Sequence, residues 1–247
     1  MLAGRICPLD FDECAAVVLF FSMILELLQK LITPRPKGWI AYYGLEDWYL
    51  HLSEDTRQKI KAYSARPDEV DKGTRLGTTQ SAQSYLSTIG TYADSKDPEF
   101  AEFMFQYALK APDDNPIDRH FVYYHLIDLL YKQRNKRPDA IDLCIKYCLE
   151  DIQRIEAFKV AYIKQYEGIQ DNLIANGHMK PQDRYEVKLP NIPSFDRLRI
   201  IYEKQGRFRE AIQIASKAIE VGAWDIDAGN TCITKLMKKL TSSQNSR

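Results

Sequence analysis

The sequence has no excess of charge of either sign. Its 34 Lys and Arg residues balance 34 Asp and Glu residues in a chain of 247 positions. A protein without a net field is not drawn strongly to nucleic acid or to anionic lipid. The basic run from Lys132 to Arg137 is a local exception, and it leaves a nucleic-acid-associated regulatory protein as a lesser alternative. Because the run lies at a predicted helix end, where cations offset the negative end of the dipole, it also has a purely structural explanation.

The sequence also lacks an uninterrupted hydrophobic run of membrane length. Residues 14–32 are strongly apolar, but only about eleven of them precede Glu26, whereas a membrane-spanning helix needs about 20. Acidic residues precede the run and no small-residue cleavage site follows it, so it is a poor signal peptide. We expect an apolar N-terminal helix within residues 1–38, packed on the rest of the chain or forming a homodimer interface. A membrane anchor through residues 14–32 is the weaker alternative.

Cysteine is scarce and irregularly spaced, which excludes a disulfide framework. The five Cys residues are an odd count, and this usage is typical of a reducing compartment, here the cytoplasm. A membrane-associated location through residues 14–32 is the alternative. Cys144 and Cys148 share a helical face, but no second pair completes a zinc site, so we interpret them as buried thiols.

No catalytic motif is present. The segment from Gly73 to Gly77 lacks the Gly-Lys-Ser/Thr ending of a phosphate-binding loop. His120 and His125 are five residues apart, which places them about 140° apart on a helix and prevents them from sharing a metal. The sequence therefore predicts no catalytic residues, no metal site and no cofactor.

A repeat is the most informative feature that the chain does have. In three segments a Tyr is followed nine residues later by an Ala: Tyr92 and Ala101, Tyr131 and Ala140, Tyr202 and Ala211. Apolar residues around each pair recur at spacings of three, four and seven, which is the stripe of a packed helix. Between Tyr and Ala lie Pro98, Pro138 and Gly206, which favour a turn between two helices. Stacked helical hairpins are the expected result.

The third segment, from Phe195 to Ala218, closely resembles a tetratricopeptide repeat. The signature positions of that family are occupied by Phe195, Leu198, Tyr202, Gly206, Phe208, Ala211 and Ala218. The segment from His120 to Cys148 resembles the family more weakly, and that from Ser81 to Pro112 is weaker still. Where the family prefers a small residue, directly after the Leu position, the chain has Ile89, Asp128 and Arg199. Helix packing must therefore differ there.

The resemblance implies an all-α fold, a right-handed stack of antiparallel helical hairpins forming a tetratricopeptide-like solenoid. It implies that the first helix of each hairpin lines a concave surface that binds a protein or peptide, as in an adaptor or scaffold. The residues expected on that surface are Leu86, Gly90, His125, Leu129, Lys132, Asp196, Ile200 and Glu203. This set lacks the Lys, Asn and Arg cluster with which some family members clamp a C-terminal carboxylate, so such a ligand is disfavoured.

The expected organisation has five parts. They are the apolar N-terminal helix at 1–38, an aromatic-rich helical segment at 39–64, a polar loop at 65–80, the repeat domain at 81–240 and a disordered tail at 241–247. The aromatic residues of the second part are interpreted as the core of a terminal hairpin rather than a ligand slot. Residues 149–176 form either one long helix or an extra hairpin. A turn at 225–230 and a short capping helix at 231–240 complete the repeat domain.

Overall fold

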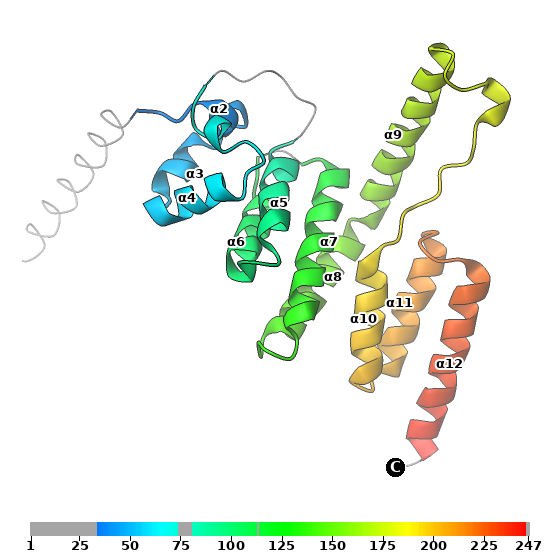
Figure 1. Cartoon of the computed structure of the whole chain (residues 1–247). Helices are drawn as coiled ribbons and strands as arrows, with labels where there is room; N and C mark the ends of the chain where they lie inside the picture. The colour runs from blue at the N-terminus through cyan, green and yellow to red at the C-terminus, as the bar shows by residue number, and fades with distance from the viewer. Residues whose placement is uncertain (1–33, 74–80, 113, 246–247) are drawn as a thin grey trace, which may run out of the picture. The chain divides into compact units, whose positions relative to one another are not determined.

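The protein is all-α in a computed structural model that describes residues 34–73, 81–112 and 114–245 (Figure 1). This part of the chain contains eleven α-helices and two short 3-10 turns, and no β-strand. It divides into two compact units, residues 34–58 with 68–73 and residues 59–67 with 81–245. The predicted N-terminal helix and its proposed dimer or membrane contact lie outside the described residues, apart from positions 34–38. In the described part, no helix is long and apolar enough to cross a membrane.

The first unit is built from short helices and a returning segment. It contains α2 (Gly38–Tyr42), α3 (Glu46–His51), the start of α4 (Glu54–Ala62) and residues 68–73. The returning segment packs closely, because the Tyr49 hydroxyl donates to the Asp71 carboxylate at 3.1 Å and Val70 is fully buried. Gly38 adopts φ +61°, and a Cβ there would lie 2.0 Å from the Glu69 carbonyl oxygen. Part of the predicted 65–80 loop is therefore packed structure; residues 74–80 lie outside the described part.

The predicted interpretation of the aromatic segment as core is supported by burial. Tyr43 is 9% and Tyr49 2% exposed, although Tyr42 is 41% exposed.

The helix expected to begin after Ser53 is present as α4. The Ser53 hydroxyl accepts a hydrogen bond from the Thr56 N–H at 3.2 Å, as a helix-capping side chain does.

Three pairs of consecutive helices pack together in the second unit. They are α5 (Ala82–Ala93) with α6 (Pro98–Ala108), α7 (Pro116–Gln133) with α8 (Ala140–Gln153), and α10 (Pro193–Lys204) with α11 (Phe208–Glu220). Local chemistry fixes their starts: the Asp97 carboxylate accepts from the Phe100 N–H at 3.1 Å, and Asn115 caps α7 in the same way. The turn before α11 contains Gly206 at φ +72°, the left-handed conformation that ends a helix.

Burial of the repeat positions follows the strength of the sequence pattern. Ala101, Ala140 and Ala211 are all fully buried, as expected for helix crossings. The repeated Tyr is 5% exposed at position 202, half-buried at Tyr131 and 53% exposed at Tyr92. The Tyr position is therefore a core position only in the last pair and lies on the surface in the first.

A buried ion pair accounts for one departure from the apolar pattern. Glu102 occupies a position that is Ile in the other two segments, and it is only 7% exposed. Its carboxylate pairs with the guanidinium of Arg137, which also contacts the Asp139 carboxylate at 2.6 Å. Because a buried carboxylate is tolerated only when it is paired, Arg137 of the next hairpin compensates the charge of Glu102.

Residues 149–176 form neither one long helix nor an added hairpin. The chain breaks at Arg154, where ψ is near 2°, and continues as α9 (Ile155–Ala175), which packs against α7. Ile155 and Phe158 of α9 join a core with Ile192, Phe195 and residues of α11. The far half of α9 and the following loop extend from this core (Figure 1). Gln170 anchors the loop, since its side chain bonds both backbone groups of Tyr185.

The C-terminal helix is longer than predicted. Helix α12 runs from Ile226 to Asn245 without a turn at 225–230 and includes most of the expected disordered tail. The Asp225 side chain accepts from the Asp227 N–H at 2.9 Å and so starts the helix where a turn was expected. Only residues 246–247 of the predicted tail lie outside the described part.

Candidate functional site

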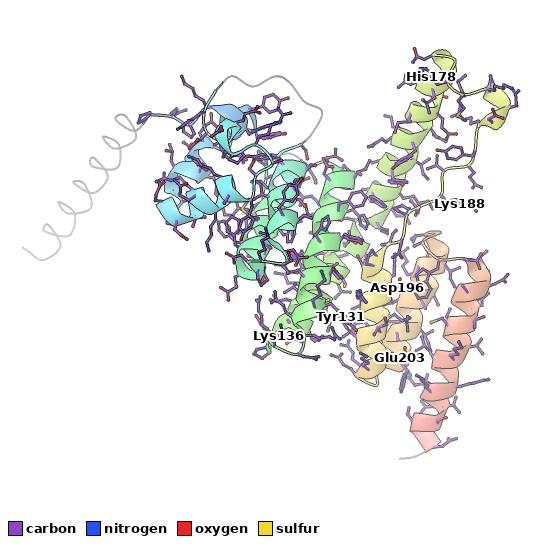
Figure 2. The ribbon with its side chains drawn as sticks, in the orientation of Figure 1. Tyr131, Lys136, His178, Lys188, Asp196 and Glu203 are labelled. Atoms are coloured by element: carbon purple, nitrogen blue, oxygen red, sulfur yellow. The ribbon has the colours of Figure 1, made fainter. Side chains whose placement is uncertain are left out.

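The eight predicted surface residues differ in how far they are exposed to solvent. Leu86 and Gly90 of α5 and Leu129 of α7 are buried, whereas His125, Asp196, Ile200 and Glu203 are half-buried and Lys132 is exposed. Asp196 and Glu203 lie at different levels of α10, with Tyr131 on the neighbouring α7 (Figure 2). The residues from α10 and Lys132 are therefore accessible, and those from α5 are not.

The contact between the α5–α6 hairpin and α7 is filled, and we call it the closed seam. The Phe105 ring lies against Gly90, where an added Cβ would be 2.7 Å from a ring carbon. Phe105 also stacks on the His125 ring, with the ring centroids 5.7 Å apart and the planes at 10°. Burial lowers the pKa of His125, which favours the neutral imidazole. The prediction is thus corrected for Leu86, Gly90 and Leu129: all three are buried inside the protein and present nothing to a partner.

A hollow of about 280 Å³ lies between α7 and α10. We call it the α7–α10 hollow. Its walls are formed by Tyr124, Asp128, Asn191, Pro193, Asp196, Arg197 and Ile200. Two of these, Asp196 and Ile200, belong to the predicted surface, and the other five were not predicted.

Most of the charges around the α7–α10 hollow are paired within the protein. The Asp128 carboxylate contacts the Lys132 ammonium at 2.9 Å and the Arg197 guanidinium at 3.5 Å. Lys132 reaches Asp94 as well, at 3.1 Å, and Arg197 lies over the Tyr131 ring at 4.5 Å. These contacts fix Asp128 and Arg197, whereas Asp196 forms no ion pair within the described residues.

Asp196 is half-buried, and within the described residues it has neither a hydrogen bond nor an ion pair. Burial raises the pKa of its carboxyl group, an effect that Arg199 and Arg197 oppose from a distance. Because desolvation penalises the charged form, an ionised Asp196 is less stable here than in water. A cation placed in the hollow would offset that cost.

A second hollow, of about 500 Å³, lies between α10 and α12, and we call it the α10–α12 hollow. Its lining residues are Arg199, Glu203, Ala228, Thr231, Cys232, Lys235, Leu236, Lys238 and Lys239. Glu203 accepts from Arg199 at 2.7 Å and from Lys239 at 2.5 Å, and the Lys239 contact lowers the pKa of Glu203. Four cationic side chains therefore surround one carboxylate, and the wall is positive.

Each of the two hollows is lined by a charged residue from the set Ile89, Asp128 and Arg199. Asp128 and Arg199 stand where a tetratricopeptide repeat prefers a small residue, and each lines one hollow. A charged side chain at that position keeps the next helix from approaching as closely as a small residue would allow. This departure was the sequence signal that could have located both hollows.

A buried polar cluster joins α7, α8 and α10 away from these hollows. His120 Nδ1 donates to the Asp151 carboxylate at 2.9 Å, and the Ser194 hydroxyl donates to the same carboxylate. All three side chains are at most 2% exposed. In this arrangement Asp151 separates the hydroxyl from the imidazole, so His120 is not placed to take a proton from Ser194. The cluster serves to hold three helices together.

Cys144 and Cys148 are both fully buried on α8, the position expected for thiols in a hairpin core. Burial raises the pKa of Cys148 well above its usual value, which favours the protonated thiol. Across residues 34–73, 81–112 and 114–245, no three His, Cys, Asp or Glu side chains are grouped so that they could hold a metal ion.

Comparison with known proteins adds one relative. Over 193 residues the chain is 24% identical to an uncharacterized protein of Aquifex aeolicus (strain VF5), covering 73% of this chain and 83% of that protein. No family model matches the chain. No solved structure matches it either. Function is therefore inferred from the geometry of the two hollows.

Proposed function

We propose that this protein is a non-enzymatic adaptor or scaffold of the cytoplasm that binds a protein or peptide through the face formed by α7, α10 and α12. The observation that carries the proposal is the presence of two hollows beside α10, one shared with α7 and one with α12. Neighbouring hollows along successive helices suit an extended ligand that crosses several helices better than a compact small molecule.

The proposal includes a tetratricopeptide-like architecture for the second unit. It is supported by the three packed helix pairs, by the buried Ala at each crossing and by contacts of α10 with both α7 and α8. We propose that these hairpins form a right-handed stack in which α5, α7, α10 and α12 occupy the first-helix positions. Such stacks bury a continuous core and expose one side of the first helices.

The side chains of the face also favour a polypeptide partner. The walls mix an aromatic ring, an aliphatic side chain and both signs of charge, as provided by Tyr124, Ile200, Asp196 and Lys235. Protein interfaces combine apolar anchors with a polar rim in this way. A purely positive surface would instead favour nucleic acid.

The test is a pulldown from extracts of the source cell with the full chain and two charge-introducing variants. Ile200→Lys places an ammonium group in the α7–α10 hollow, and Ile169→Lys makes the same change on α9, where Ile169 is 42% exposed. We expect Ile200→Lys to lose a partner that both the wild type and Ile169→Lys retain, with unchanged helical circular dichroism. Retention of every partner by Ile200→Lys would show that this face is not the binding surface.

A further inference from the structure

We propose that the two hollows recognise opposite charges on one extended peptide: the α7–α10 hollow takes a Lys or Arg side chain, and the α10–α12 hollow takes Asp or Glu side chains. This inference rests on the proposed function and adds the chemistry and order of the residues that the partner must carry. In each hollow, charged side chains form no ion pair within the described residues, and these side chains set the preference.

The α7–α10 hollow is suited to a cation because of Asp196. This carboxylate is half-buried and has no hydrogen bond or ion pair in the described part of the chain, while its neighbours Asp128 and Arg197 are paired with each other. The volume of about 280 Å³ is several times the roughly 30 Å³ that one water molecule occupies in the liquid. A flexible cationic side chain could therefore enter, with the Tyr124 ring as an additional wall on which a cation can lie.

The α10–α12 hollow is suited to carboxylates because its cations outnumber its acid. Glu203 engages Arg199 and Lys239, whereas the ammonium groups of Lys235 and Lys238 form no ion pair within the described residues. The Arg199 Nε–H is buried and has no acceptor there. An incoming carboxylate would supply both an acceptor for a donor that lacks one and a counter-charge for two lysines.

The geometry of α10 sets the spacing of the charges on the peptide. Asp196 and Glu203 are seven residues apart. Seven residues correspond to roughly 10 Å along a helix axis, and adjacent helices are about 8–10 Å apart, so the hollows are separated by roughly 10–15 Å. An extended peptide advances about 3.3 Å per residue. The basic and acidic side chains of the partner should therefore be separated by about three to five residues.

A peptide fits this face better than RNA does. A polyanion bound along the lysines of α12 would bring its next phosphates towards Asp196 and Asp128, where like charges repel. A peptide with charges of both signs meets attraction in both hollows. Single-stranded RNA is accordingly the competing ligand in the test.

The test uses a phage library of random 12-residue peptides, selected on the full-length protein, followed by affinity measurements with synthetic versions of the enriched peptides. We expect enrichment of Lys or Arg about three to five residues from Asp or Glu, in one chain order. The peptide with the two charged positions exchanged should bind about tenfold more weakly, since each charge would then face a wall of its own sign. Equal affinity for both orders would overturn the inference.

Variants assign each preference to its hollow. Asp196→Asn should weaken the enriched peptide about tenfold and abolish its dependence on the basic residue, whereas the double change Lys235→Glu, Lys238→Glu should abolish dependence on the acidic residue. Glu186→Gln and Lys164→Glu are matched controls on exposed positions of the loop and α9. Both controls should bind like the wild type. Unchanged charge preferences in the hollow variants would overturn the assignment.

The outcomes separate this inference from the proposed function. Peptides that lose binding in Ile200→Lys but show no charge preference would overturn the charge order and keep the binding face. A library without any peptide sensitive to Ile200→Lys would remove the binding face and the charge order together. Displacement of the enriched peptide by a 12-nucleotide poly(U) probe, lost on Lys235→Glu, would assign the lysine-rich hollow to RNA and overturn the peptide assignment.

Discussion

The closed seam and the α7–α10 hollow show how equivalent positions in successive hairpins acquire different roles. His125 and Leu129 of α7 stand at the same distances before the repeated Tyr as Asp196 and Ile200 of α10. In α7 the first stacks on Phe105 and the second is 2% exposed, whereas in α10 both line an open hollow. The repeat position therefore assigns a side chain to a face, and the size of its neighbours decides whether that face is filled.

The closed seam and the α7–α10 hollow differ for a steric and an electrostatic reason. On the closed side Gly90 has no Cβ, so the large ring of Phe105 can reach α7. On the open side Asp128 and Arg197 hold each other by an ion pair at the wall, and both remain partly exposed. Solvated charges resist the close approach that apolar side chains favour. We therefore expect packing at the closed seam to contribute to the free energy of unfolding, and packing around the α7–α10 hollow to contribute little.

The largest effect is expected from emptying the closed seam. Phe105→Ala removes a ring that is 1% exposed and should lower the free energy of unfolding by about 3–5 kcal/mol. Tyr124→Ala in the wall of the open hollow should cost only about 1 kcal/mol, because that ring is half-buried. Urea unfolding of both variants, followed by circular dichroism, provides the comparison. Equal losses of unfolding free energy would mean that the closed seam and the α7–α10 hollow do not differ in packing.

The next largest loss of stability is expected from disrupting the buried cluster of His120, Asp151 and Ser194, which links α10 to α7 and α8. Asp151→Ala leaves the His120 Nδ1–H and the Ser194 hydroxyl buried without their acceptor, and should cost about 2–3 kcal/mol. Asp142→Ala, an exposed carboxylate in the first turn of the same helix, should cost only about 0.5 kcal/mol. Urea midpoints measure both. A cost for Asp151→Ala no larger than for Asp142→Ala would show that the cluster does not hold α10.

The sequence predicted the helix pairs better than it predicted the surfaces between them. Periodicity and turn residues were sufficient for the pairs α5–α6, α7–α8 and α10–α11, because helix ends and amphipathic packing are local properties that residues such as Pro98, Pro138 and Gly206 express directly. The extent of α12 was missed, since Gly229 and Asn230 favour turns locally. In the structure Gly229 is buried, and an added Cβ would lie 2.4 Å from the Ile219 side chain. Close helix approach, not a turn, accounts for that glycine.

The candidate site was only partly accessible to sequence reasoning. Asp196, Ile200 and Glu203 were named from their positions in the repeat, and they do line the two hollows. Leu86 and Gly90 were named on the same basis but lie against neighbouring helices. Which of two equivalent positions is covered depends on a ring such as Phe105, which belongs to a different helix. That information resides in tertiary packing and cannot be obtained from periodicity alone.

The smallest effect is expected for Asp196→Asn, which tests whether the ionised Asp196 in the α7–α10 hollow lowers the free energy of unfolding. Burial raises the pKa of Asp196 above its ordinary value of 3.8, so the folded protein binds that proton more tightly than the unfolded chain. The stability contributed by this group is therefore greatest below its ordinary pKa and falls as the pH rises through the raised value. Asp196→Asn removes the cost of ionisation and should raise stability slightly at pH 7, within about 0.5 kcal/mol, with no gain near pH 3. The difference between the urea midpoints of wild type and variant at the two pH values measures it, with Glu186→Gln as the control for loss of one exposed charge. A loss of stability at pH 7 would show that Asp196 has a stabilising partner inside the protein, and the α7–α10 hollow would then have no unpaired carboxylate to offer a ligand.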